Sequence, residues 1–140
     1  MSGWSALAQQ LRRLPQLIQF ALVGGAAAAT HLAVVWLVVA ATGMAPLAAN
    51  VLAFLVAFVV SYNGHALLTF SASQVHGWGA VARFFAVACL SFVVNELLYA
   101  AALRWLPWHY VLSLALVLVV VAAGTFVLSK FWAFKARTSP

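Results

Sequence analysis

The chain has 140 residues, of which 67% are hydrophobic and only 6% are charged, and its formal net charge is +6. A soluble domain carries about 25% charged residues, so this composition excludes an ordinary water-exposed surface. The seven basic residues form no stripe for nucleic acid, and the single cysteine, Cys89, excludes an intrachain disulfide framework.

The first predicted element is a short amphipathic helix that precedes the apolar part of the chain. Its apolar residues recur at spacings of three and four: Trp4, Leu7, Leu11 and Leu14. Polar side chains fall largely on the other side of the helical wheel, and Pro15 ends the pattern. We expect this helix to lie on the cytoplasmic surface of the membrane. A frayed terminus is the alternative interpretation.

Four apolar stretches follow, each of 20 residues or more: 17–41, 47–70, 84–103 and 108–129. At a rise of about 1.5 Å per residue, each is long enough to cross a hydrocarbon layer of about 30 Å. The first stretch is too long for the apolar core of a cleaved signal peptide, so we expect it to be retained. The sequence therefore predicts an all-α membrane protein, with residues 1–140 forming a single transmembrane domain of four helices.

The basic residues indicate the orientation of these helices. Only Arg104 falls on one side of the predicted membrane, whereas six basic residues fall on the other: Arg12, Arg13, Arg83, Lys130, Lys135 and Arg137. Cytoplasmic segments carry the excess of lysine and arginine in membrane proteins. We therefore expect both termini and the link between the two hairpins to be cytoplasmic.

The two predicted hairpins repeat one another at an offset of 64 residues, with halves of about 17–70 and 81–134. In this alignment His31 corresponds to Asn95, and Gln19 corresponds to Arg83. Each half enters and leaves on the same side, so the halves are expected to be parallel repeats related by an axis along the membrane normal. Sites in such folds tend to lie between the repeats.

The ends of the hairpins carry recognisable motifs. Residues 129–134 read Ser-Lys-Phe-Trp-Ala-Phe and residues 62–70 read Tyr-Asn-Gly-His-Ala-Leu-Leu-Thr-Phe. The first half opens on Gln19-Phe20-Ala21-Leu22-Val23-Gly24-Gly25, and Arg83-Phe84 repeats that opening. Over residues 19–134, the order and spacing of these pieces resemble the GtrA-like family of small four-span membrane proteins. Three positions depart from the family pattern: Gln19 and Ala66 stand in place of basic residues, and Ser129 stands in place of asparagine.

The resemblance implies translocation of a polyprenyl-phosphate-linked sugar across the cytoplasmic membrane, for synthesis or modification of cell-surface polysaccharide. A multi-pass protein of the inner membrane is implied with it. A second function implied by the family is a non-transporting anchor that recruits a glycosyltransferase. A third possibility is a small proton-coupled cation exporter, because one membrane carboxylate suits such exchange. The residues contain no catalytic or cofactor-binding signature, so we expect neither catalysis nor a cofactor.

Glu96 is the only carboxylate of the chain and falls inside the third stretch. Burying a carboxylate in a membrane costs about 2.5 to 3.5 kcal/mol on insertion scales, which makes it a functional candidate. We interpret Glu96 and His31 as proton-coupling groups, and expect them to be able to share a proton. The alternative is that both serve as hydrogen-bonding contacts between helices.

Arg83 and Lys130 occupy the cytoplasmic ends of the third and fourth stretches, where they can bind a lipid phosphate. Topology and snorkelling are the alternative explanation. Further polar side chains follow helical spacing and are candidates for a headgroup groove: Asn63, His65, Ser91 and Asn95. A packed polar seam between helices is equally compatible with that spacing.

Small residues recur every four positions in the second stretch: Ala49, Ala53, Ala57 and Ser61. Such spacing allows helices to approach closely. Four spans enclose little volume, so we expect a homodimer that shares a central groove. The same ridge is also compatible with a seam between the first two spans of one chain. The expected partners are membrane lipid and a second copy, together with those that the resemblance implies: a polyprenyl-phosphate-linked sugar and, in the anchor alternative, a glycosyltransferase.

Overall fold

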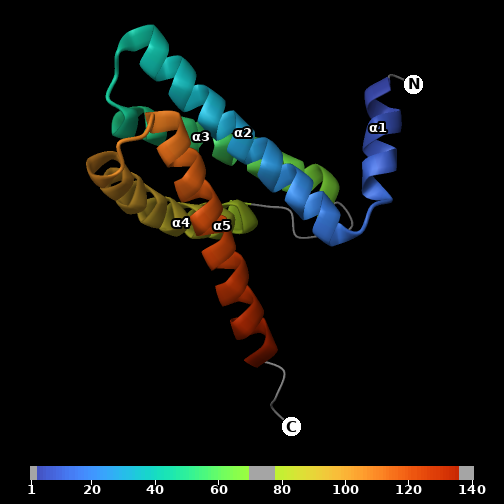
Figure 1. The fold of residues 1–140 in the computed structure, drawn as a ribbon. Helices are drawn as coiled ribbons and strands as arrows, with labels where there is room; N and C mark the ends of the chain where they lie inside the picture. Colours follow the sequence, from blue (N-terminus) through green and yellow to red (C-terminus); the bar gives the residue numbers. More distant parts are fainter. Residues whose placement is uncertain (1–2, 70–77, 136–140) are drawn as a thin grey trace. The chain divides into compact units, whose positions relative to one another are not determined.

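A computed structural model describes residues 3–69 and 78–135 of the chain, and every element in this part is a helix (Figure 1). In chain order these are α1 (Gly3–Arg12), α2 (Gln16–Thr42), α3 (Pro46–Gly64), the π-helix η1 (His65–Thr69), α4 (Trp78–Trp105) and α5 (Tyr110–Lys135). The predicted all-helical fold and the short helix before the first span are confirmed. The π-helix was not predicted.

Glycine and proline place the boundary between α2 and α3. Gly43 has a φ of 70°, and its N–H donates to the carbonyl of Val39 and closes the end of α2. This left-handed conformation favours glycine because it has no Cβ. Pro46 then starts α3, where its missing N–H costs no helical hydrogen bond. The break between the predicted stretches 17–41 and 47–70 is therefore confirmed.

Three segments of the described residues are long and apolar enough to cross a membrane: Leu17–Thr42, Pro46–Leu68 and Phe85–Trp105. The apolar segment Tyr110–Gly124 of α5 is shorter. These helices support a multi-pass membrane protein. The fourth crossing, the parallel-repeat arrangement and the cytoplasmic placement of both termini stay predictions.

The chain forms two compact units, Met1–Leu90 and Ser91–Pro140, and each is described by itself. In the first unit α2 packs against α3. Ala49 and Ala53 on α3 are fully buried, and Val23 and Val35 on α2 are buried with them. The small side chains allow the two helices to lie close together. The alanine ridge of α3 is therefore an intrachain seam, which is one of the two interpretations of this spacing.

Aromatic rings connect the start of α4 to α3 within the first unit. The ring of Phe85 lies edge-on to Phe58, with centroids 5.1 Å apart, and 6.5 Å from the centroid of Phe54. Edge-to-face ring pairs of this kind add about 0.5 to 1.5 kcal/mol to the burial of their area. They help to place the N-terminal part of α4 against α3.

The second unit contains the C-terminal part of α4 and α5, which are joined by residues 106–109. Tyr99 of α4 is fully buried, and its hydroxyl donates to the carbonyl of Tyr110 at 3.1 Å. Ser113 and Leu114 at the start of α5 are fully buried as well. A tyrosine of one helix thus contacts the first residue of the next.

Candidate functional site

The first polar contact inside the membrane-spanning part joins α2 to α3. The Nε2 of His31 lies 2.6 Å from the Oδ1 of Asn50, and both side chains are buried. An amide oxygen only accepts hydrogen bonds, so Nε2–H of His31 is the donor. One ring nitrogen is therefore committed to the neighbouring helix, and only Nδ1 is available for proton exchange with Glu96. That exchange stays a prediction.

Asn50 was not predicted as the partner of His31, because the repeat alignment pairs His31 with Asn95. Equivalent positions in two repeats need not touch. Asn50 lies on the next helix of the same hairpin. As a polar residue in an apolar stretch, it is the sequence feature that could have indicated this contact. The contact fits the alternative interpretation of His31 as a hydrogen-bonding group between helices.

Gln19 closes the junction between α1 and α2. Its side chain is 6% exposed, and its Nε2 donates to the carbonyls of Leu14 at 2.7 Å and Arg12 at 3.3 Å. Its Oε1 is buried with no hydrogen-bond partner among the described residues. In the repeat, Gln19 corresponds to Arg83. The repeat position that is basic in the second half, Arg83, is therefore occupied in the first half by a residue that hydrogen-bonds to backbone carbonyls.

His65 begins the π-helix and is 5% exposed. Its ring stacks on Phe20 of α2, with centroids 4.7 Å apart and planes inclined by 29°. This predicted substrate-binding residue is therefore packed inside the first hairpin. π-Helical segments occur frequently at functional sites.

Next to His65, α3 approaches α2 too closely for any side chain at Gly64. A Cβ at this position would lie 2.7 Å from Cγ1 of Val23. Gly64 is thus required by the packing of the hairpin end. Asn63, the preceding residue, is exposed, and its Nδ2 donates to the carbonyl of Val59 at 2.8 Å. Its Oδ1 lies on the accessible side chain, so Asn63 can still accept a hydrogen bond from a headgroup.

α1 is also connected to the end of this hairpin. The Nε of Arg12 donates to the carbonyl of Leu67 in η1 at 3.1 Å. The sequence predicts only a topological role for Arg12. Basic side chains near helix ends commonly bind the last carbonyls, but nothing in the sequence identifies this particular carbonyl.

The remaining predicted site residues lie on α4 and α5. Asn95 is buried, and Ser91 and Glu96 are half-buried, all within α4. Arg83 lies in α4 and Lys130 in α5, but their side chains fall outside the described part of the structure. Their predicted phosphate contact therefore stays a prediction.

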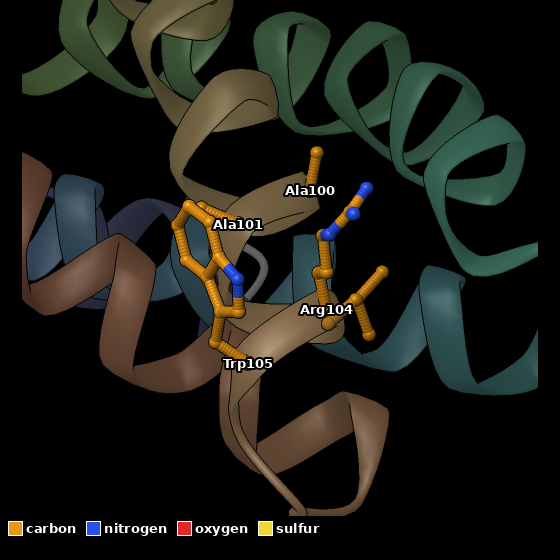
Figure 2. A pocket seen from close by; sticks show the side chains of 5 residues that line it. Ala100, Ala101, Arg104 and Trp105 are labelled. Carbon is orange, nitrogen blue, oxygen red and sulfur yellow. The ribbon is translucent and has the colours of Figure 1, made fainter.

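A shallow, open surface depression at the C-terminal end of α4 was not predicted. Five residues of this one helix line it: Ala100, Ala101, Leu103, Arg104 and Trp105. Figure 2 shows the guanidinium of Arg104 alongside Ala100, one turn earlier, and the indole of Trp105 on the side of Ala101.

Comparison with known proteins identifies a family. The family model described as GtrA/DPMS, transmembrane domain, matches residues 19–134 of the chain. No curated protein and no solved structure matches significantly. The match extends over both predicted hairpins, from Gln19 near the start of the first apolar stretch to Phe134 after the last.

Proposed function

The chain belongs to the GtrA/DPMS transmembrane-domain family, and on that premise we propose that it moves a polyprenyl-phosphate-linked sugar across the cytoplasmic membrane. The lipid-linked sugar would serve synthesis or modification of cell-surface polysaccharide. The observation that carries this proposal is the family match across residues 19–134, which covers both hairpins. On the basis of this family membership, we propose roles for the polar residues of the helices.

The central physical problem is the charge of the headgroup. A phosphate cannot enter hydrocarbon cheaply, so a translocator must provide polar groups along the path while the isoprenoid tails stay in lipid. On α4, Ser91 and Asn95 follow Arg83 at intervals that keep them on one helical face. We propose that this face, the α4 polar face of Arg83, Ser91 and Asn95, carries the headgroup.

The phosphate is bound on the second-half side of the protein. A guanidinium offers two parallel hydrogen bonds to phosphate oxygens, and Lys130 adds a point charge. In the first half, Gln19 is already engaged by the carbonyls of Leu14 and Arg12. Ala66 also lacks the basic side chain of the family pattern. These two departures support an asymmetric site, with Arg83 as its main anchor.

Glu96 lies next to Asn95 on α4 and is half-buried. We propose that its carboxyl takes up and releases a proton during transport, since a neutral carboxyl is cheaper in a membrane than a charged one. His31 contributes through Nδ1 only, because Nε2–H donates to Asn50. The protein acts without catalysis, as a homodimer of the inner membrane.

Binding of a short-chain polyprenyl phosphate to the protein in nanodiscs tests the phosphate site. Arg83→Ala should weaken binding by about tenfold or more. Arg83→Lys should weaken it as well, because lysine keeps the charge and loses the two-pronged contact. Lys130→Ala should have the smaller effect. Arg13→Ala is the control, because Arg13 is an exposed arginine ahead of α2. Equal affinity in all of these proteins would contradict a phosphate site at Arg83.

A further inference from the structure

One side of α1 is apolar and exposed, although the helix is attached to the hairpin end. Trp4 is 80% exposed and Leu7 is 48% exposed, whereas Ser5 and Ala8 are half-buried. Successive residues of a helix are rotated by about 100°, which places Ser5, Ala8 and Arg12 within about 60° of one another. Trp4 and Leu7 occupy the adjacent side. α1 therefore contacts the hairpin along one side and leaves the neighbouring apolar side exposed.

A membrane surface is the partner that fits this exposed side. α1 contains no acidic residue, and Arg12 and Arg13 follow its apolar residues. The exposed apolar surface also continues along the chain to Leu17, which is 70% exposed and begins the first membrane-spanning segment. A short helix that combines an apolar side with basic residues is typical of helices that bind anionic lipid.

Arg12 differs from Arg13 in how its side chain is held. The Nε of Arg12 donates to the carbonyl of Leu67 at 3.1 Å, and the side chain is nevertheless exposed. Its terminal nitrogens can therefore still donate to an anion, and the Nε contact orients them. Arg13 lies one residue beyond α1, and its guanidinium has no hydrogen-bond partner among the described residues. Of these two arginines, Arg12 is the one whose donors are already oriented for a phosphate.

We propose that the junction of α1 and η1 binds an anionic phospholipid of the bilayer, with the guanidinium of Arg12 as the phosphate ligand. The acyl chains of this lipid lie against the exposed side of Trp4 and Leu7. Arg12 then binds the lipid through its terminal nitrogens and the hairpin through Nε, so the lipid stabilises the attachment of α1 to η1. The site does not rest on the proposed function. It is the same in either orientation of the chain, because α1 and η1 meet at one end of the hairpin.

Binding of a fluorescent phosphatidylglycerol to the full chain in micelles of a neutral detergent tests the site. Wild type should bind this lipid about fivefold or more tightly than a fluorescent phosphatidylcholine, whose choline group neutralises the phosphate charge. Arg12→Ala should lower the affinity for phosphatidylglycerol by about tenfold. Arg12→Lys should lower it as well, because lysine keeps the charge but cannot bind Leu67 and a phosphate at once.

Arg13→Ala is the matched control, because it removes the same charge from the neighbouring residue. It should change the affinity for phosphatidylglycerol by no more than about threefold, as expected of a solvent-exposed charge. Glycerol 3-phosphate should compete at least tenfold more weakly than phosphatidylglycerol, because it has no acyl chains. Equal losses in Arg12→Ala and Arg13→Ala would overturn Arg12 as the ligand. Equally strong competition by glycerol 3-phosphate would overturn a lipid ligand.

Hydrogen exchange of the amides of 3–12 tests whether the bound lipid stabilises α1. Exchange in wild type should be about fivefold slower in nanodiscs of phosphatidylglycerol than in nanodiscs of phosphatidylcholine. Arg12→Ala should exchange at the same rate in both lipids, whereas Arg13→Ala should keep the difference. Equal wild-type exchange in the two lipids, or a difference that persists in Arg12→Ala, would overturn the link between the lipid and the hairpin end.

Discussion

At the scale of single residues, the close contact between Gly64 and Val23 controls how α3 ends. The Cβ of any other residue at Gly64 would lie 2.7 Å from a methyl of Val23. Valine is stiff at χ1, because two heavy atoms branch from its Cβ, so its methyl cannot easily rotate away. The glycine therefore sets the separation of α2 and α3 beside His65.

Gly64→Ala should lower the free energy of unfolding by about 1 to 3 kcal/mol, as overpacking does. Alanine favours helix over glycine by about 1 kcal/mol, so a loss of stability would oppose intrinsic propensity and report the steric contact. Equilibrium unfolding in mild detergent measures the change. Gly24→Ala is the matched control, because a Cβ there meets no described atom within 4 Å. Equal stability of the two variants would contradict the close approach.

The sequence directly shows which polar residues lie within the apolar stretches. It does not show which residues they contact. His31 and Gln19 were both identified, yet the contact of His31 with Asn50 depends on how α2 and α3 align across their turn. The role of Gln19 depends on the path of the chain around Pro15, which brings the carbonyls of Arg12 and Leu14 to its amide. A pattern of residue types contains neither alignment nor path.

At the scale of elements, α1 is attached to the hairpin end rather than only to the lipid surface. Arg12 donates to the carbonyl of Leu67, and Gln19 binds the carbonyl of Arg12. Both contacts involve the last residue of α1. α1 is therefore positioned by the same hairpin end that contains His65 and the π-helix.

Arg12→Ala should loosen α1. Loss of one hydrogen bond of about 1 kcal/mol corresponds to about fivefold faster opening. Hydrogen exchange of the amides of 3–12 in nanodiscs measures that opening. Arg13→Ala removes the adjacent exposed arginine and should leave exchange unchanged. Identical exchange in Arg12→Ala and Arg13→Ala would show that α1 depends on lipid alone.

Helices were more predictable than their ends. Long apolar runs identify α2 and α3. Gly43 and Pro46 mark the boundary between them, because glycine and proline have definite conformational preferences at helix ends. The predicted second span, 47–70, contained a change of helix type that the sequence does not mark. His65–Thr69 is π-helical in the structure. Residues 65–69 continue the apolar pattern of α3. The i→i+5 hydrogen bonding of a π-helix requires no particular residue types, so the composition does not indicate it.

At the scale of the whole molecule, the orientation is predicted from six basic residues on one side and Arg104 on the other. By the positive-inside rule we expect both termini to be cytoplasmic. A reporter enzyme that is active only in the cytoplasm should be active when it is fused after Pro140. Alkaline phosphatase fused in the turn at 106–108 should be active in the periplasm. Periplasmic phosphatase activity from the fusion after Pro140 would reverse the orientation and move Arg104 to the cytoplasmic side.

The repeat is the other whole-molecule prediction, and the two halves differ in a way that bears on function. The first half uses its opening position, Gln19, to hold backbone carbonyls. The second half retains Arg83 at the equivalent position. Sequence comparison detects the loss of charge at Gln19, and the structure gives the physical use of its replacement. If the proposed function holds, we expect the phosphate contact to depend on the second half.

Headgroup translocation in sealed vesicles tests the central proposal most directly. A polyprenyl phosphate sugar with a fluorescent headgroup is reconstituted with the protein, and a membrane-impermeant reductant quenches the label that reaches the outer leaflet. Wild-type vesicles should lose nearly all fluorescence, because label from the inner leaflet is moved outward. Vesicles with Arg83→Ala should lose the inner-leaflet label about tenfold more slowly, and Arg13→Ala should behave as wild type. Wild-type vesicles that quench no further than protein-free vesicles would contradict translocation.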